Sequence, residues 1–126
     1  MIVLFFGDVV GERATAFLAE QLPGLRRAHG ADLVIVNAEN SAPNGLGMGG
    51  KQVHELLEAG ADVITGGNHS WDSSDSVAQL ALPRVLRPAN LAPGVPGRGI
   101  AHLAVGGVTV TVINLADQCA MRSVKA

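Results

Sequence analysis

The chain contains three short apolar runs, at residues 2–6 (IVLFF), 33–37 (LVIVN) and 62–65 (DVIT). They contain several β-branched residues, and none of them alternates regularly between apolar and polar positions. Strands that are buried on both faces of a parallel sheet have this pattern. We therefore predict three parallel strands at these positions.

Segments with a helical period separate the three runs. Residues 12–28 place apolar residues on roughly one face, although Pro23 is expected to kink or end that helix. Residues 51–59 (KQVHELLEA) form a second amphipathic segment, with Gly60 as its expected stop. The order β-α-β-α-β predicts an α/β fold with right-handed crossovers.

The second part of the chain has a different character. Residues 73–82 (SSDSVAQLAL) predict a short helix capped by Ser or Asp, and residues 87–99 are rich in Pro and Gly, as in a long surface loop. Residues 100–115 predict a hairpin that turns at Gly106 and Gly107, with its valines on one side and its threonines on the other. The last eleven residues, 116–126, show no periodic pattern.

Composition narrows the class of protein. A chain of 126 residues with 48% hydrophobic residues is typical of one small folded domain. The net charge of −2 and the low aromatic content of 3% argue against a nucleic-acid or membrane surface. A single Cys, no signal-peptide pattern and no apolar run of membrane-spanning length favour the reducing cytoplasm.

Polar side chains follow every predicted strand, and in an open α/β sheet these positions meet at one edge, where ligands bind. Carboxylates, amide carbonyls and imidazoles are ligands for divalent ions such as Mn, Fe or Mg. A two-metal site could bind a phosphate ester and activate water, with a His beside the ions as proton donor. The residues at these positions are Asp8, Asn37, Glu39, Asn40, Asn68, His69, Asp72, Asn114 and Asp117.

Each of these residues also has a structural interpretation. Asp8 and Asp72 could cap helices, and Asn or Asp residues commonly stabilise turns through their own backbone. His69 could be a structural hydrogen-bonding residue, and a domain whose polar turns are only turns remains an alternative. Three further histidines are expected to have no role in a site: His29, His54 and His102.

A glycine-rich segment, GLGMGGKQ at residues 45–52, competes with the metal-site hypothesis. Gly45, Gly50 and Lys51 match part of a nucleotide-binding P-loop, but Gln52 occupies the position that should be Ser or Thr. The segment also does not follow the first strand directly. We therefore expect a flexible loop that leads into a helix.

Five motifs in order, GDVVGE, NAEN, GGNHSWD, LRPAN and PGRG, resemble the YmdB-like metallophosphoesterases, a branch of the calcineurin-like phosphoesterase superfamily. The resemblance extends over about residues 1–115. It implies an α/β/β/α sandwich, of which this chain carries the N-terminal β-α-β-α-β half and a hairpin. It also implies a cytoplasmic phosphodiesterase that acts on cyclic nucleotides such as 2′,3′-cyclic AMP.

The resemblance assigns roles to individual residues. It makes Asp8 and Asn40 ligands of one metal, Asn68 a ligand of a second metal, Glu39 the carboxylate that bridges both, and His69 the proton donor. Iron or manganese is the expected metal, with magnesium as an alternative. Four more residues are expected to contact the substrate or to support the ligands: Asp72, Arg87, Asn90 and Arg98.

The chain also departs from the family. Family members are about twice as long, and their second half supplies three histidine ligands from DFHAE-like and GTHTH-like segments that are not found here. We therefore expect residues 1–115 to form an incomplete domain, residues 116–126 to diverge, and this chain to be weakly active or inactive alone. A bare sheet face is expected to make the chain form a homo-oligomer or pair with a missing partner segment. The alternative function is a non-catalytic domain that binds a nucleotide or a protein.

Overall fold

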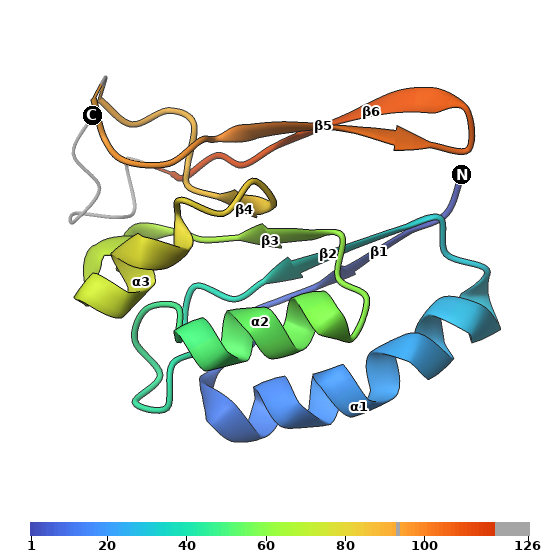
Figure 1. The fold of residues 1–126 in the computed structure, drawn as a ribbon, viewed down its shortest axis with the longest axis horizontal. Helices are drawn as coiled ribbons and strands as arrows, with labels where there is room; N and C mark the ends of the chain where they lie inside the picture. Colours follow the sequence, from blue (N-terminus) through green and yellow to red (C-terminus); the bar gives the residue numbers. More distant parts are fainter. Residues whose placement is uncertain (93, 118–126) are drawn as a thin grey trace.

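A four-stranded parallel sheet forms the centre of the computed structural model, which describes residues 1–92 and 94–117. The strands lie in the order β1-β2-β3-β4 (Figure 1). The three predicted strands are present. The fourth strand, β4, was not predicted, because a strand of two residues shows no periodic pattern in the sequence. The bounds are β1 Val3–Phe6, β2 Leu33–Asn37, β3 Val63–Thr65 and β4 Val85–Leu86.

Two helices cover one face of this sheet: α1 (Gly11–His29) and α2 (Gly50–Glu58) (Figure 1). Their apolar faces and the sheet enclose the main hydrophobic core, which includes the fully buried Leu22, Val34 and Leu56. Helix α2 ends at the expected place, before Gly60, which has a φ of 110°. Each helix therefore brings the chain back to the start of the next parallel strand.

Pro23 does not end the first helix, so that part of the expectation is wrong. Helix α1 continues past it to His29, because contacts on both sides hold the helix against the sheet. Leu22 is fully buried, and Arg26 donates hydrogen bonds to the Gly60 carbonyl at 2.8 Å and to the Asp62 carboxylate at 2.9 Å. These contacts offset the backbone hydrogen bond that a proline inside a helix removes.

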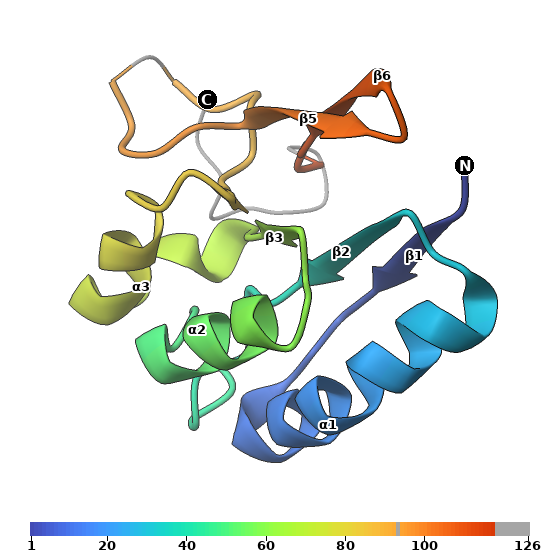
Figure 2. The same cartoon turned by 45° about the vertical axis from the view of Figure 1, so that its right-hand side comes forward.

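An antiparallel hairpin covers part of the opposite face of the sheet, so that the molecule has three layers (Figure 2). It consists of β5 (Ile100–Val105) and β6 (Val108–Ile113), joined by Gly106 and Gly107, whose φ angles are 57° and 82°. Its inner face forms a second core with the sheet, in which β6 contributes Val110 and Val112 and the sheet contributes Leu33, Val63 and Leu86. The predicted hairpin is confirmed, and the layers of helices, sheet and hairpin agree with the predicted N-terminal half of an α/β/β/α sandwich.

The segment between β3 and β4 contains a 3-10 helix, η1 (Asn68–Trp71), and a short α-helix, α3 (Ser74–Gln79). The Ser73 hydroxyl caps α3 by accepting from the Ser76 amide at 3.1 Å, as the sequence predicted. Within the described ranges, no helix combines the length and apolarity that crossing a membrane requires. The tail predicted to diverge lies, apart from Ala116 and Asp117, outside the described residues.

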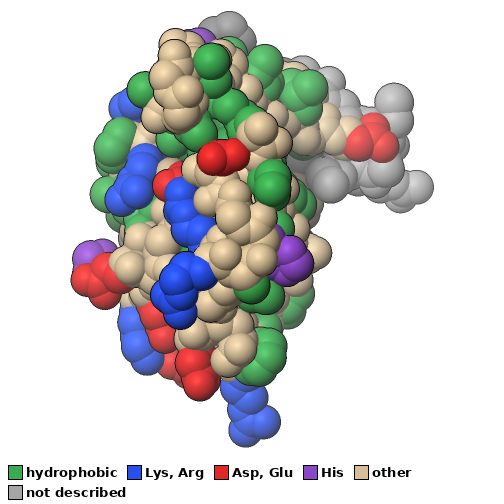
Figure 3. Space-filling view, turned by 90° about the vertical axis from the view of Figure 1, so that its right-hand side faces the viewer, with side chains coloured by type: hydrophobic (Ala, Val, Ile, Leu, Met, Phe, Trp, Pro, Cys, Tyr) green, Lys and Arg blue, Asp and Glu red, His purple; other side chains and the backbone are tan. Residues whose placement is uncertain are grey.

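The hairpin leaves apolar side chains of β1 and of the end of β6 in solvent. Phe5 is 62% exposed and Val3 46% exposed on β1, while Ile113 and Leu115 are also exposed. A view of the molecule turned by 90° shows hydrophobic side chains over its upper part, on the hairpin side (Figure 3). Exposed apolar surface of this kind favours association.

We expect Phe5→Ser to weaken self-association of the chain, because it removes a large apolar side chain from the open face of β1. Sedimentation velocity over a range of protein concentrations measures this effect. Phe17→Ser is the matched control, because Phe17 is 68% exposed but lies on α1, in the helical layer. A parent chain that sediments as a monomer at all concentrations would contradict the expectation.

Candidate functional site

The loops that follow β1 and β2 are joined at the carboxyl edge of the sheet. The Val9 amide donates to the Asn37 carbonyl at 3.1 Å, and the Gly11 amide donates to the Asn40 carbonyl at 2.8 Å. This pairing brings the Asn40 Nδ2 atom to 2.7 Å from Asp8 Oδ2. The two side chains, which are 32 positions apart in the sequence, are thus hydrogen-bonded.

The side-chain oxygen of Asn40 makes no such bond. This Oδ1 atom is buried and has no hydrogen-bond partner among the described residues. The same holds for Oδ1 of Asn37, the last residue of β2. A buried amide oxygen without a partner is costly for a protein unless a further group binds to it.

Asp8 does not cap the helix that follows it, so that structural interpretation is wrong. Helix α1 begins at Gly11, and its N-cap is Val10, which makes no side-chain capping bond. The carboxylate of Asp8 is exposed and accepts the Asn40 hydrogen bond instead. The acidic side chain is therefore directed to the edge of the sheet rather than to the helix.

Glu39 reaches across to the turn that follows β3. Its carboxylate lies so close to Gly67 that a Cβ atom at that position would overlap it. The Glu39 Oε2 atom also lies 3.5 Å from the backbone amide of His69. The absence of a side chain at Gly67 thus allows the carboxylate to sit beside Asn68 and His69.

A network of small polar residues supports the turn that carries Asn68 and His69. The Ser70 hydroxyl accepts from the Gly67 amide at 3.0 Å, and the Ser76 hydroxyl donates to the Ser70 carbonyl at 2.9 Å. The Ser76 hydroxyl also accepts from the Met48 amide at 2.9 Å. The glycine-rich loop before α2 is therefore packed against this turn.

His69 and Asp72 interact within this turn. Their Nδ1 and Oδ2 atoms are 2.6 Å apart, and each side chain is about one third exposed. Since Ser73 is the cap of α3, the capping interpretation of Asp72 is wrong. The carboxylate instead occupies one nitrogen of the imidazole and leaves Nε2 for other contacts.

The structure gives the glycine-rich segment no P-loop geometry. Lys51 forms an ion pair of 2.8 Å with Glu12, which joins α2 to α1 at the surface. The side-chain hydrogen bond with Lys51 lowers the pKa of Glu12, and the same bond raises the pKa of Lys51. Gln52, at the position of the metal-binding hydroxyl of a P-loop, is buried beside Gly49.

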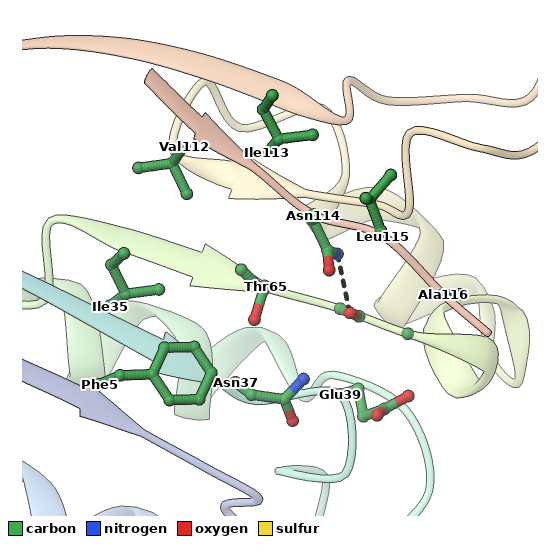
Figure 4. Close-up of a pocket in the computed structure, with 12 residues that line it drawn as sticks. Phe5, Ile35, Asn37, Glu39, Thr65, Val112, Ile113, Asn114, Leu115 and Ala116 are labelled. Carbon is green, nitrogen blue, oxygen red and sulfur yellow. Dashed lines mark hydrogen bonds between the residues drawn. The ribbon is translucent and has the colours of Figure 1, made fainter. Parts of the chain in front are cut away.

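A cavity of about 480 Å³ opens beside Glu39, between the parallel sheet and the end of β6 (Figure 4). Asn37, Glu39 and Thr65 lie on the sheet side of this cavity (Figure 4). Much of the remainder is lined by the apolar side chains of Phe5, Ile35, Val112, Ile113 and Leu115, together with Asn114. The cavity therefore combines a polar end at the sheet edge with an apolar wall.

The other predicted site residues lie in the loop that follows β4. Arg87 donates from Nη1 to the Pro88 carbonyl at 2.7 Å and from Nε to the Gly97 carbonyl at 3.3 Å. The Asn90 side chain bonds with both backbone groups of Ala116, at 2.6 and 3.0 Å. Arg98 is exposed and pairs with Leu86 through its backbone. In these contacts Arg87 and Asn90 hold the loop in place.

The remaining histidines have local partners or lie at the surface. His54 Nε2 is 3.1 Å from Glu58 on the exposed face of α2, and His102 Nδ1 is 2.9 Å from the Thr111 hydroxyl. His29 is exposed in the last turn of α1. These positions lie on helices or on the hairpin rather than in the strand-end loops.

The sequence placed Asn114 among the polar strand ends without a role. In the structure its Nδ2 atom donates to the Gly66 carbonyl at 2.9 Å (Figure 4) and to the Leu86 carbonyl at 3.0 Å. The only feature of the sequence that pointed to Asn114 was its position directly after the hairpin. Its partners come from loops that no local pattern could connect to it.

The structure thus brings two groups of predicted residues to one edge: Asp8 with Asn40, and Glu39 with the Asn68–His69 turn. In residues 1–92 and 94–117, no three His, Cys, Asp or Glu side chains lie close enough to hold a metal ion. The predicted ligand set contains only two such side chains and depends on two amides as well.

Comparison with known proteins agrees with this architecture. The family model of YmdB-like proteins matches residues 4–126. The chain belongs to the YmdB-like family. Two relatives of the YmdB-like chain are a 2′,3′-cyclic-nucleotide 2′-phosphodiesterase of Bacillus subtilis, 40% identical over 116 residues, and a putative phosphatase/phosphodiesterase of Mycoplasma genitalium, 34% identical over 118 residues.

Solved structures of relatives have the same fold. A hypothetical protein from Thermus thermophilus superposes with a TM-score of 0.89 at 37% identity, over 100% of this chain and 49% of that one. A novel phosphatase from Mycoplasma pneumoniae superposes with a TM-score of 0.80 at 34% identity, over 90% and 42% of the two chains. The matched residues make up about 90% of this chain but only 44% and 42% of the two sequence relatives. This chain therefore spans less than half of the length of each relative.

We expect Gly67→Ala to displace the Glu39 carboxylate while the chain still folds, because the overlapping atoms belong to the end of a flexible side chain. The amide resonance of His69, which faces that carboxylate, should shift in ¹⁵N NMR spectra. Gly24→Ala is the control, because a Cβ there would meet no atom within 4 Å. An unchanged His69 resonance in Gly67→Ala would contradict the proximity of Glu39 to the turn.

Proposed function

We propose that this chain provides part of a two-metal site for the hydrolysis of phosphodiesters. In this proposal Asp8 and Asn40 would hold one divalent ion, Asn68 would hold a second ion, and the Glu39 carboxylate would contribute to both. The observation that carries the proposal is the unpartnered, buried Oδ1 of Asn40 beside the Asp8 carboxylate.

The chemistry of these residues fits divalent ions. Carboxylate and amide oxygens suit Mn²⁺, Fe²⁺ and Mg²⁺. The partnerless Oδ1 of Asn40 would gain a bound ion as its partner. The contact of the Glu39 carboxylate with Gly67, directly before Asn68, supports the proposed shared role of Glu39. We propose iron or manganese, because the family resemblance favours them.

Two divalent ions in such a site supply electrostatic stabilisation of the phosphoryl group and activation of a water molecule. The protein's own contribution is to bind and orient the substrate and to deliver a proton. His69 is the proposed proton donor to the leaving oxygen. Asp72 occupies its Nδ1 atom, so that Nε2 is the nitrogen available to the substrate.

We propose a cyclic nucleotide such as 2′,3′-cyclic AMP as the substrate. This proposal rests on the name of the Bacillus subtilis relative, which is a 2′,3′-cyclic-nucleotide 2′-phosphodiesterase. The proposed ligand set consists of four side chains without a histidine, so we expect this chain by itself to bind metal weakly and to hydrolyse substrates slowly. Asp72, Arg87, Asn90 and Arg98 remain proposals for substrate contact or support.

We expect Glu39→Gln to weaken Mn²⁺ binding by about tenfold or more, because the bridging carboxylate loses its charge. Electron paramagnetic resonance of free Mn²⁺ during a titration measures the affinity. Glu20→Gln is the control, because Glu20 is exposed on α1 and also loses one negative charge. A parent chain that binds no divalent metal would contradict the proposed site.

We expect His69→Asn to slow the hydrolysis of 2′,3′-cyclic AMP by about 10²-fold or more, since its alkoxide leaving group requires a proton donor. The effect on bis-p-nitrophenyl phosphate should be smaller, because its leaving group is stable without a proton. Mn²⁺ affinity should stay near that of the parent. Initial rates with both substrates measure the difference.

His54→Asn is the control for this experiment, because His54 is exposed on α2 and pairs with Glu58. Equal loss of rate with both substrates would contradict the proton-donor role. A parent chain that binds Mn²⁺ but hydrolyses neither substrate would contradict the slow hydrolysis that we expect of this chain by itself. A parent chain that binds no divalent ion and hydrolyses neither substrate would favour the alternative function, a domain that binds a nucleotide or a protein.

A further inference from the structure

The hydrogen-bond ladder between β3 and β4 contains a position that the backbone cannot fill. The Ile64 amide donates to the Arg84 carbonyl, and the Gly66 amide donates to the Leu86 carbonyl, both at 2.8 Å. In a parallel ladder of this register, every second residue of β3 donates its amide to one residue of the neighbouring strand. Its carbonyl accepts from the amide that lies two residues further along that strand. The amide that would next donate to the Gly66 carbonyl therefore belongs to residue 88.

Residue 88 is a proline, which has no N–H group. The Asn114 side chain supplies a donor in its place, because its Nδ2 atom lies 2.9 Å from the Gly66 carbonyl oxygen. The same nitrogen lies 3.0 Å from the Leu86 carbonyl oxygen. One amide group thus donates to a carbonyl at the end of each of the two neighbouring strands.

The backbone of Asn114 is itself held on both sides. Its amide donates to the Gly99 carbonyl at 3.0 Å, and its carbonyl accepts from the Ala89 amide at 2.7 Å. The side chain is therefore presented from a segment at the end of β6 that backbone hydrogen bonds hold on both sides. Figure 4 shows the Asn114 amide directed toward the chain that follows Thr65. A rigidly held donor can fix the orientation of the peptide that accepts from it.

The accepting peptide is the one that joins Gly66 to Gly67. Gly67 contacts the Glu39 carboxylate and directly precedes Asn68. We infer that Asn114 is a positioning residue for the candidate site: it replaces the hydrogen bond that Pro88 cannot make and holds the Gly67–Asn68 turn against Glu39. The expected effect of Asn114 on metal binding rests on the proposed function, whereas its expected effect on the turn does not.

The first test needs no metal. Asn114→Ala should raise the hydrogen-exchange rates of the Gly67 and Ser70 amides by about tenfold, because the turn loses its external hydrogen bond. Exchange at the central strand, for example at Val36, should change much less. Amide exchange followed by NMR measures these rates residue by residue.

Val112→Ala is the matched control, because it removes apolar contacts from the same strand but leaves the Asn114 amide in place. It should weaken the hairpin without a selective effect on Gly67 and Ser70. If Asn114→Ala leaves these two amides as protected as in the parent, or if Val112→Ala exposes them equally, the inference is overturned. Should Asn114→Ala fail to fold, Asn114→Ser retains one donor and is expected to show a smaller change of the same kind.

The second test uses Mn²⁺ and the nearly isosteric Asn114→Asp, whose carboxylate would face two carbonyl oxygens. We expect Mn²⁺ affinity to fall by about 10-fold to 100-fold, as for residues that support metal ligands, while Val112→Ala stays near the parent. Equal affinity in Asn114→Asp and the parent would overturn the effect on the site. A parent that binds no Mn²⁺ would refute the proposed function, while the exchange experiment would still decide the role of Asn114 in the turn.

Discussion

The parallel pairing of β2 with both β1 and β3 is the constraint on which the other features depend. Because all three strands run in the same direction, the loops that follow them emerge at one edge of the sheet. The pairing continues beyond the strands, where Val9 bonds to Asn37 and Gly11 bonds to Asn40. The loops that carry Asp8, Glu39 and Asn68 lie at one edge for that reason, although the three residues are far apart in the chain.

The shape of this edge of the sheet depends on glycines, which have no side chain, as well as on the polar side chains. Gly67 gives room to the Glu39 carboxylate, and Gly66 and Gly47 are packed so closely that a Cβ atom would crowd Ser70 or Ser76. The same close packing lets a chain of hydroxyl and amide hydrogen bonds hold the turn. The glycine-rich segments thus act as structural components of the site rather than as a nucleotide loop.

The hairpin has two roles in this architecture. Its apolar inner face covers β2, β3 and β4 through residues such as Val112, while the outer face of β1 stays in solvent. At its end, Asn114 donates to the Gly66 and Leu86 carbonyls. The layer that covers the second face of the sheet therefore also reaches the edge where the candidate site lies.

Local patterns in the sequence determined a large part of this structure. Apolar runs identified β1 to β3, glycines at positive φ marked the ends of α2 and the hairpin turn, and strand-end positions selected Asp8, Glu39 and His69. Such features depend on neighbours within a few residues, so they can be recognised in the chain itself. The two-residue strand β4 and the continuation of α1 through Pro23 could not be recognised, since distant packing stabilises both.

Only the tertiary structure decided how the strand-end residues interact. The bond between Asn40 and Asp8, the contact of Glu39 with Gly67, and the donation from Asn114 to Gly66 join residues separated by 28 to 48 positions. The role of Asn114 follows from a missing amide at Pro88, which matters only once the register of β3 and β4 is known. The sequence by itself determined which chemical groups reach the edge of the sheet. Their partners were decided by strand register and by the packing of the hairpin, because hydrogen bonds require atomic proximity that no local pattern specifies.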